Sequence, residues 1–205
     1  VMINAAGSMP GDLQCLWQAR KSSQYHVEYA FSCMGYEIPA ALGVKLARPD
    51  SEVVAIVGDG TYQMLPMELA TIVQERVKVI FVLLQNYGFA SIGALSESRG
   101  SQRFGTKYRS GKGELLPVDI AANAESWGIT VLRVSTIAEF KDAYAQAAAS
   151  PTSVLIHIET DLMGPNPPGS SWWEVAISEV SRLESTQRAR EWYEGEKLAQ
   201  RHYLN

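Results

Sequence analysis

Short apolar runs alternate along the chain with segments in which apolar residues recur at helical spacing. The runs predict buried strands at residues 1–4, 25–31, 53–57, 77–84, 129–134 and 154–158. Helices are predicted between them, and one further helix at residues 178–201. Strands that alternate with helices are typical of a doubly wound, mainly parallel α/β sheet with helices on both faces. We expect this fold for residues 1–160, followed by a C-terminal helical extension.

The predicted helices carry local start and stop signals. One is expected at residues 12–19, and another continues through Ala47 and ends before Pro49. Thr136 and Glu139 form a capping-box pattern at the start of a further helix. Residues at helical spacing mark three helices. The first two stripes are Met67, Ala70, Thr71 and Gln74 after Pro66, and Ile120, Ala124 and Trp127 before Gly128. The third stripe, which we expect to face inward, is Ile137, Phe140, Tyr144 and Ala147.

Oxygen donors follow two of the predicted strands. Gly58-Asp59-Gly60 comes directly after residues 53–57, and Asn86 comes just after residues 77–84. Ligands of open α/β sheets bind beyond the carboxyl ends of the strands, where we expect both side chains to lie. Carboxylate and amide oxygens suit Mg²⁺, which fills its remaining positions with water and phosphate oxygens. The pattern therefore indicates a site for a metal-bridged diphosphate.

This spacing resembles a known signature. Gly58-Asp59-Gly60, 25 further residues and then Asn86 resemble the metal-binding motif of thiamine diphosphate-dependent enzymes. The resemblance implies that Asp59, Asn86 and the backbone carbonyl of Gly88 hold Mg²⁺. Many members have a second asparagine where this chain has Tyr87, a departure that a backbone ligand at Gly88 tolerates. The alternative is a structural Gly-Asp-Gly turn and an unrelated loop asparagine.

The same resemblance implies contacts with thiamine diphosphate. Residues 32–43 resemble a family segment that places a bulky apolar side chain, here Met34, beneath the cofactor; the alternative is a core methionine. Residues 6–11 form a glycine- and serine-containing loop before a helix, which suits an anion. The expected cofactor-binding residues are Gly7, Ser8, Met9, Cys33, Met34, Gly58, Gly60, Thr61 and Phe89. The activating glutamate of the family comes from a separate domain, so no catalytic residue is assigned here.

Composition narrows the class of partner. The 205 residues are 46% hydrophobic and carry a net charge of −4, which argues against nucleic acid or an anionic membrane. No apolar run approaches the length of a membrane span, and no signal peptide is recognisable. Cys15 and Cys33 have no metal-binding spacing and are expected to be small buried residues in a reducing cytoplasm. His26 and His157 fall in predicted strands and are expected to be core residues.

Residues 91–113 combine five basic residues with five glycines. A long glycine-containing loop in a compact domain is usually functional or disordered. We expect a lid over the site, or a contact with an anionic or polyhydroxylated substrate, with poor order when no ligand is bound. A solvated mobile loop is the alternative.

The last 45 residues depart from the α/β pattern. Residues 161–169 have the composition of a linker, and three of the five tryptophans follow it: Trp172, Trp173 and Trp192. We expect this extension to pack on its own domain or on a neighbouring subunit. Residues 103–109 and 171–181 resemble corresponding segments of the trihydroxycyclohexanedione hydrolases of myo-inositol catabolism.

The resemblance implies an enzyme that cleaves a carbon–carbon bond of a cyclic trihydroxy-1,2-dione with water, giving 5-deoxyglucuronate. Because Val1 is not an initiator, we expect pyrimidine-binding and central domains to precede this chain. A second subunit would complete the site in a homodimer or homotetramer, and the chain alone would be inactive. The alternatives are a carboligase of the acetolactate synthase or glyoxylate carboligase kind, and a non-catalytic phosphate-binding or structural module.

Overall fold

The computed structural model describes residues 1–28, 30–161 and 175–201. The chain divides into two compact units. The first comprises Val1–Phe89 with Tyr108–Leu162 and contains the sheet, and the second comprises Ala90–Lys107 with Met163–Asn205. No helix in the described ranges is long and apolar enough to cross a membrane.

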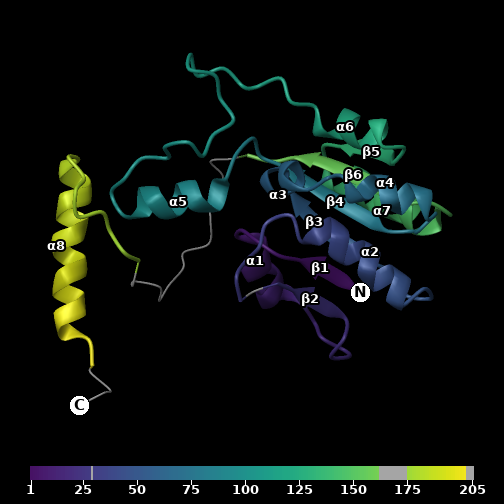
Figure 1. The fold of residues 1–205 in the computed structure, drawn as a ribbon, viewed down its shortest axis with the longest axis horizontal. Coiled ribbons are helices and arrows are strands. Elements are labelled where there is room, and N and C mark those ends of the chain that lie inside the picture. Colours follow the sequence, from purple (N-terminus) through teal and green to yellow (C-terminus); the bar gives the residue numbers. More distant parts are fainter. Residues whose placement is uncertain (29, 162–174, 202–205) are drawn as a thin grey trace. The chain divides into compact units, whose positions relative to one another are not determined.

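The first unit is built on a six-stranded sheet in which every pair of neighbouring strands is parallel (Figure 1). The spatial order is β2-β1-β3-β4-β6-β5. This arrangement confirms the expected doubly wound α/β fold. The strands are β1 (Met2–Asn4), β2 (Tyr25–Val27), β3 (Val54–Gly58), β4 (Ile80–Gln85), β5 (Thr130–Val134) and β6 (Val154–Glu159).

Helices cover both faces of this sheet because alternate strand residues point to opposite sides. On one face, Ala55, Val57 and Phe81 pack with buried residues of α2, α4 and α6. On the other, Val54 and Ile80 pack with α7. The helices of this unit are α1 (Met9–Leu16), α2 (Glu37–Ala47), α3 (Asp59–Met64), α4 (Glu68–Gln74), α6 (Ile120–Ser126) and α7 (Ile137–Ala149).

Some predicted boundaries were wrong. The β2 strand has three residues rather than seven, and α1 begins at Met9, three residues before the expected start. An unexpected helix, α3, starts at Asp59 itself. The Gly-Asp-Gly sequence therefore ends a strand and begins a helix within two residues, which draws the Asp59 side chain into the first helical turn.

The expected inward face of α7 is confirmed for Ala147, which is buried, and for Phe140 and Tyr144, which pack against the core, but it is wrong for Ile137. In α7, Ile137 is 73% exposed, whereas Ala143 and Ala147 are buried. Small alanine side chains let the helix lie close to the sheet, and Ile137 is about 120° around the axis from Ala143. Met67, the N-cap residue of α4, is 58% exposed, and the buried residues of that helix are Leu69 and Ile72. The capping box of Thr136 and Glu139 is present as predicted.

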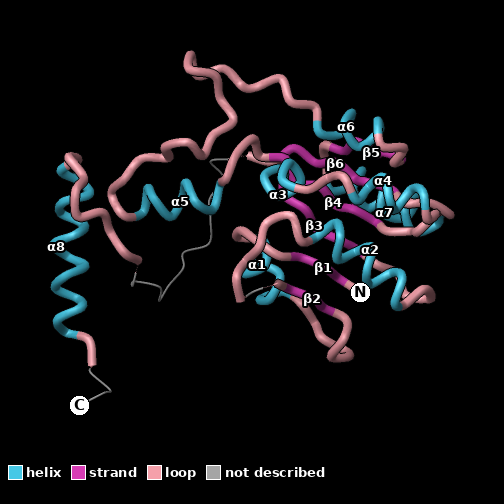
Figure 2. Tube along the Cα trace, in the orientation of Figure 1, coloured by secondary structure: helices cyan, strands magenta, loops and turns pink. Residues whose placement is uncertain are grey.

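The segment at residues 91–113 is not one continuous loop. Its first part belongs to α5 (Ala90–Ser98), which Figure 2 shows as a helix. Glycine was interpreted as a loop signal, but Gly93 has a packing role inside this helix. A Cβ at Gly93 would lie 2.7 Å from Oγ1 of Thr106, so glycine lets α5 approach the chain that follows it.

In the second unit, α8 (Glu184–Ala199) packs against the end of the α5 region. The carbonyl of Gly100 accepts hydrogen bonds from the hydroxyls of Ser185 at 2.6 Å and Thr186 at 2.8 Å. The guanidinium of Arg99 lies 5.3 Å from the ring centroid of Trp192. The C-terminal extension therefore contacts residues 99–100. Most of the predicted linker, with Trp172 and Trp173, lies outside the described residues.

Candidate functional site

The carboxyl ends of β3 and β4 bring the two halves of the predicted motif together. The strands are adjacent and parallel, and Gly58 is in register with Leu84. The residues that follow, Asp59 on one strand and Asn86 on the other, therefore lie at the same edge of the sheet. Their placement matches the rim at which open α/β sheets bind ligands.

Backbone amides surround the carboxylate of Asp59. Its Oδ2 accepts hydrogen bonds from the N–H groups of Asn86 at 3.1 Å, Tyr87 at 2.6 Å and Gly88 at 3.3 Å. Its Oδ1 accepts one from the N–H of Gly60 at 2.8 Å. The side chain is buried. Three of these donors come from the turn after β4, so this carboxylate joins the ends of two strands.

The turn after β4 adopts a conformation that is unusual for its sequence. Tyr87 has φ +60°, in the left-handed region that residues with a Cβ rarely enter. This conformation aims successive N–H groups at one point, which is how backbone nests bind negative charge. Burial raises the pKa of Asp59 above its ordinary value, and the hydrogen bonds from Tyr87, Gly60, Gly88 and Asn86 oppose that rise.

Asn86 supplies the observation that fits a metal. Its side-chain Oδ1 is buried and has no hydrogen-bond partner in the described structure. A buried carbonyl oxygen without a partner is costly, by about 1–3 kcal/mol, unless a ligand satisfies it. With the Oδ1 of Asp59, it provides two hard oxygen donors, which is the chemistry that Mg²⁺ prefers. The predicted set has only one acidic side chain, and no group of three or more His, Cys, Asp and Glu that could hold a metal occurs in the described residues.

Apolar side chains pack beside this edge. A Cβ at Gly60 would lie 2.8 Å from the Phe89 ring and 3.2 Å from the methyl group of Met34. A Cβ at Gly58 would lie 3.5 Å from the methyl group of Met9. Five of the residues expected to bind the cofactor are therefore neighbours, although they come from four separate parts of the sequence.

The loop expected to contact a diphosphate has mixed features. Gly7 has φ +99°, a conformation that favours glycine, and Ser8 is the N-cap residue of α1. The Ser8 hydroxyl makes no capping hydrogen bond, and both residues are exposed. Met9 is the first residue of α1. The structure therefore leaves Gly7 and Ser8 accessible at the beginning of a helix.

The hydroxyl of Thr61 is engaged inside the protein. Its oxygen accepts a hydrogen bond from the N–H of Gly35 at 2.5 Å and donates to Oε2 of Glu37 at 2.8 Å. Since a hydroxyl has one proton to donate, a ligand contact from Thr61 would come from its backbone N–H. Glu37 was not singled out by the sequence, where it lies 24 residues from Thr61.

Tyr108 is a second residue that sequence reasoning missed. Its ring meets that of Phe89 edge to face, with centroids 5.4 Å apart. Its hydroxyl is buried without a hydrogen-bond partner in the described structure. Burial, with a smaller contribution from the Asp59 charge, raises the pKa of Tyr108 to about 12. The available signals were its position in the glycine-containing segment that was expected to be a lid, and its place within residues 103–109, which resemble a hydrolase segment.

The expectation for the cysteines was wrong, because Cys15 and Cys33 are both exposed. Cys15 lies on α1, of which only Pro10 is buried. Cys33 lies in the connection from β2 to α2, where its backbone N–H donates to Oε2 of Glu28 at 2.5 Å. A contact between Cys33 and the cofactor stays a prediction, which rests on the position of Cys33 next to Met34 in the sequence.

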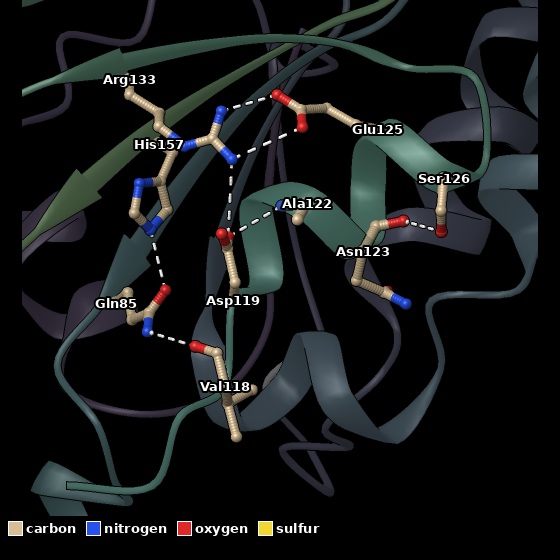
Figure 3. Close-up of polar contacts among 9 residues, drawn as sticks. All are labelled: Gln85, Val118, Asp119, Ala122, Asn123, Glu125, Ser126, Arg133 and His157. Carbon is tan, nitrogen blue, oxygen red and sulfur yellow. Dashed lines mark hydrogen bonds and ion pairs between the residues drawn. The ribbon is translucent and has the colours of Figure 1, made fainter.

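His157 is confirmed as a buried, hydrogen-bonded core residue. Its Nε2 lies 2.8 Å from Oε1 of Gln85, whose amide donates to the carbonyl of Val118 (Figure 3). In the same view, Asp119 accepts from the N–H of Ala122 at the start of α6 and pairs with Arg133 at 3.5 Å. The His157–Gln85 contact is buried and the Asp119 contacts are exposed; together they connect β4, β5, β6 and the start of α6.

Known proteins with similar sequences include two that share 41% identity over 93% of this chain. They are "3D-(3,5/4)-trihydroxycyclohexane-1,2-dione hydrolase 2" of Bacillus cereus and "3D-(3,5/4)-trihydroxycyclohexane-1,2-dione hydrolase" of Bacillus anthracis. The chain spans 31% of the length of these relatives.

Solved structures show the same fold. The benzoylformate decarboxylase of Polynucleobacter necessarius superposes with a TM-score of 0.68 at 23% identity, over 82% of this chain and 31% of its own. The thiamine diphosphate-dependent 4-hydroxybenzoylformate decarboxylase of Rhodococcus jostii RHA1 gives 0.67 at 23% identity, over 78% and 29%. The family described as "Thiamine pyrophosphate enzyme, C-terminal TPP binding domain" matches residues 5–158. The chain belongs to this family of thiamine pyrophosphate-binding domains.

Proposed function

We propose that this chain is the cofactor-binding part of a thiamine diphosphate-dependent hydrolase that opens a cyclic trihydroxy-1,2-dione. The single observation that carries the cofactor assignment is the pair formed by Asp59 and Asn86. One carboxylate is held by four backbone N–H groups, and beside it stands an amide oxygen with no partner in the described structure.

In this proposal, Mg²⁺ is held by Oδ1 of Asp59, Oδ1 of Asn86 and the carbonyl of Gly88. The Oδ2 of Asp59 already accepts three hydrogen bonds, which leaves Oδ1 as the oxygen with free capacity. When bound, thiamine diphosphate supplies the electron sink for cleaving a carbon–carbon bond next to a carbonyl. A non-catalytic module has little need for such a pair of oxygens.

The other cofactor contacts follow from the arrangement around this pair. Met34 and Phe89 converge on Gly60 and would shape the apolar side of the site. The accessible N–H groups at Gly7 and Ser8 would face the diphosphate, where the start of α1 favours negative charge. The chain's own residues thus bind and orient the cofactor.

The substrate class rests on sequence similarity, namely 41% identity over 93% of the chain to proteins named trihydroxycyclohexanedione hydrolases. We propose that further domains of the same protein and a second subunit complete the site, in a homodimer or homotetramer. Because Cys15 and Cys33 are free thiols, we propose that the protein works in the cytoplasm. The same sequence similarity is the basis on which we propose a role in inositol catabolism.

The test is an assay of the full-length protein that contains this chain, with Mg²⁺ and thiamine diphosphate. We expect ring opening of the cyclic trihydroxy-1,2-dione and no carboligation of pyruvate. Asp59→Ala should abolish the reaction, and the 205-residue chain alone should be inactive. Carboligation of pyruvate without ring opening would overturn the substrate assignment in favour of an acetolactate synthase-type enzyme.

A further inference from the structure

A buried glutamate lies next to the candidate site and takes no part in the metal set. Glu37 is the first residue of α2, and its side chain has no solvent exposure. It forms no ion pair within the described residues. A buried carboxyl group is costly to desolvate, so a residue with only a packing role would be served better by an apolar side chain of the same size.

Glu37 connects two segments that carry predicted cofactor contacts. The hydroxyl of Thr61 donates to Oε2 of Glu37 at 2.8 Å, and the N–H of Gly35 donates to Oγ1 of Thr61 at 2.5 Å. Thr61 lies two residues after Asp59 in α3, and Gly35 follows Met34. The relay therefore fixes the Met34 segment against the helix that begins at Asp59.

A third segment also approaches the carboxyl group. Burial raises the pKa of Glu37 above its ordinary value. The hydrogen bond from the Thr61 hydroxyl and smaller effects of backbone N–H groups, including those of Ala6 and Ala5 just before the Gly7–Ser8 loop, oppose that rise. Oε1 has no geometrically satisfactory partner in the described structure. Residues 5–6 and Thr61 approach the Glu37 side chain directly, and Gly35 is connected to it through the Thr61 hydroxyl.

We propose that Glu37 is a positioning residue that fixes the geometry of the cofactor site by holding the Thr61 hydroxyl, whose oxygen in turn accepts from the Gly35 amide. This proposal rests on the proposed function. Without the carboxylate acceptor, the Thr61 hydroxyl is free to rotate, and the Gly35 amide loses its fixed partner. Met34 is then no longer held at a defined distance from Gly60 and Asp59, and the diphosphate must order these segments when it binds, at a cost in affinity.

The experiment measures the dissociation constant of thiamine diphosphate in the presence of Mg²⁺, by calorimetry on the full-length protein. Glu37→Ala should weaken binding by about tenfold or more, as expected for loss of a charge-assisted hydrogen bond. Glu37→Gln should keep binding within about threefold of the wild type, because its amide oxygen can still accept from Thr61. Thr61→Val should weaken binding as much as Glu37→Ala does. The variant that carries both substitutions should bind thiamine diphosphate no more weakly than either single variant.

Leu42→Ala is the matched control, because Leu42 is a buried residue of the same helix with no link to the relay. It should lower thermal stability at least as much as Glu37→Ala while leaving the dissociation constant unchanged. An equal loss of affinity in Leu42→Ala, or no loss in Glu37→Ala, would overturn the proposal. Where Glu37→Ala fails to fold, Thr61→Val against Thr61→Ser gives the same test.

Hydrogen exchange at the Gly35 amide separates this proposal from the proposed function. The amide should exchange faster in cofactor-free Glu37→Ala than in the wild type and Leu42→Ala. Equal Gly35 exchange in all three would overturn the relay, whatever the cofactor. Failure of the wild type to bind thiamine diphosphate would instead overturn the proposed function.

Discussion

The backbone N–H of Tyr87 lies 2.6 Å from Oδ2 of Asp59, the shortest of the three hydrogen bonds that this oxygen accepts from the turn after β4. The bond depends on φ +60° at Tyr87, a conformation that costs a residue with a side chain about 1–2 kcal/mol. Backbone strain of this kind is typical of functional sites, where the surrounding structure maintains it. Here it holds a buried carboxylate in place before any ligand arrives.

Removing each member of the predicted metal pair should have different consequences for stability. Asp59→Ala leaves four backbone N–H groups without their acceptor, so we expect the free energy of unfolding to fall by at least about 3 kcal/mol without metal. Asn86→Ala removes an oxygen that has no partner in the described structure, and we expect a change within about 1 kcal/mol. Urea denaturation in EDTA measures both, and equal losses would contradict this account of the pair.

Tyr87→Asn should be tolerated. Asparagine enters the left-handed region more readily than tyrosine, and the hydrogen bond to Asp59 comes from the backbone. We expect the free energy of unfolding to stay within about 1 kcal/mol of the wild-type value, with Mg²⁺-dependent binding retained. Tyr87→Val is the control, since a β-branched residue is disfavoured at this φ. Loss of metal binding in Tyr87→Asn would show that the tyrosine side chain itself contributes.

Gly60→Ala should be destabilising because the site has no room for a Cβ atom. The added Cβ would lie 2.8 Å from the Phe89 ring, and we expect a loss of about 1–3 kcal/mol. Truncating the ring removes the clash, so Gly60→Ala should cost much less in a Phe89→Ala background than in the wild type. Thermal and urea unfolding of the four proteins give this double-mutant cycle. If the losses in unfolding free energy were strictly additive, the contact with Phe89 would not explain why position 60 requires glycine.

The pH dependence of stability should report on His157. Burial lowers its pKa below the ordinary 6.5, with Arg133 adding to the effect and Glu159 and Asp119 opposing it. The unfolded chain therefore binds a proton more readily than the folded one. The stabilising contribution of a neutral His157 is present above pH 6.5 and is lost as the pH falls below it. His157→Gln should show a smaller drop in unfolding free energy between about pH 8 and pH 5, and an unchanged drop would contradict this assignment.

The sequence was most informative where a local pattern coincided with a buried element. β3 and β4 could be predicted from β-branched apolar runs, and the position of Asp59 relative to Asn86 follows once those strands are parallel neighbours. The helix α5 could not be predicted, because a glycine such as Gly93 looks the same in the sequence whether it marks a loop or a close packing contact. Ile137 was misassigned because Ala143 and Ala147 define the contact face, and alanine carries little periodic signal.

Within the site, single-residue chemistry was predictable and cooperation between distant residues was not. Asp59 and Asn86 are recognisable by residue type and spacing. Glu37 and Thr61 are 24 residues apart, and nothing in either neighbourhood indicates that they share a hydrogen bond. The burial of the Tyr108 hydroxyl could not be predicted either, since it depends on Phe89 and on the fold of the intervening segment.

The most direct test of the account is the affinity of the full-length protein for thiamine diphosphate, measured by calorimetry with and without Mg²⁺, in the wild type and in Asn86→Ala. We predict that wild-type binding requires Mg²⁺ and that Asn86→Ala weakens it by about tenfold or more, equivalent to about 1.4 kcal/mol, without loss of fold. Binding that is independent of Mg²⁺, or equally strong in Asn86→Ala, would contradict the claim that Asp59 and Asn86 form a metal-bridged diphosphate site.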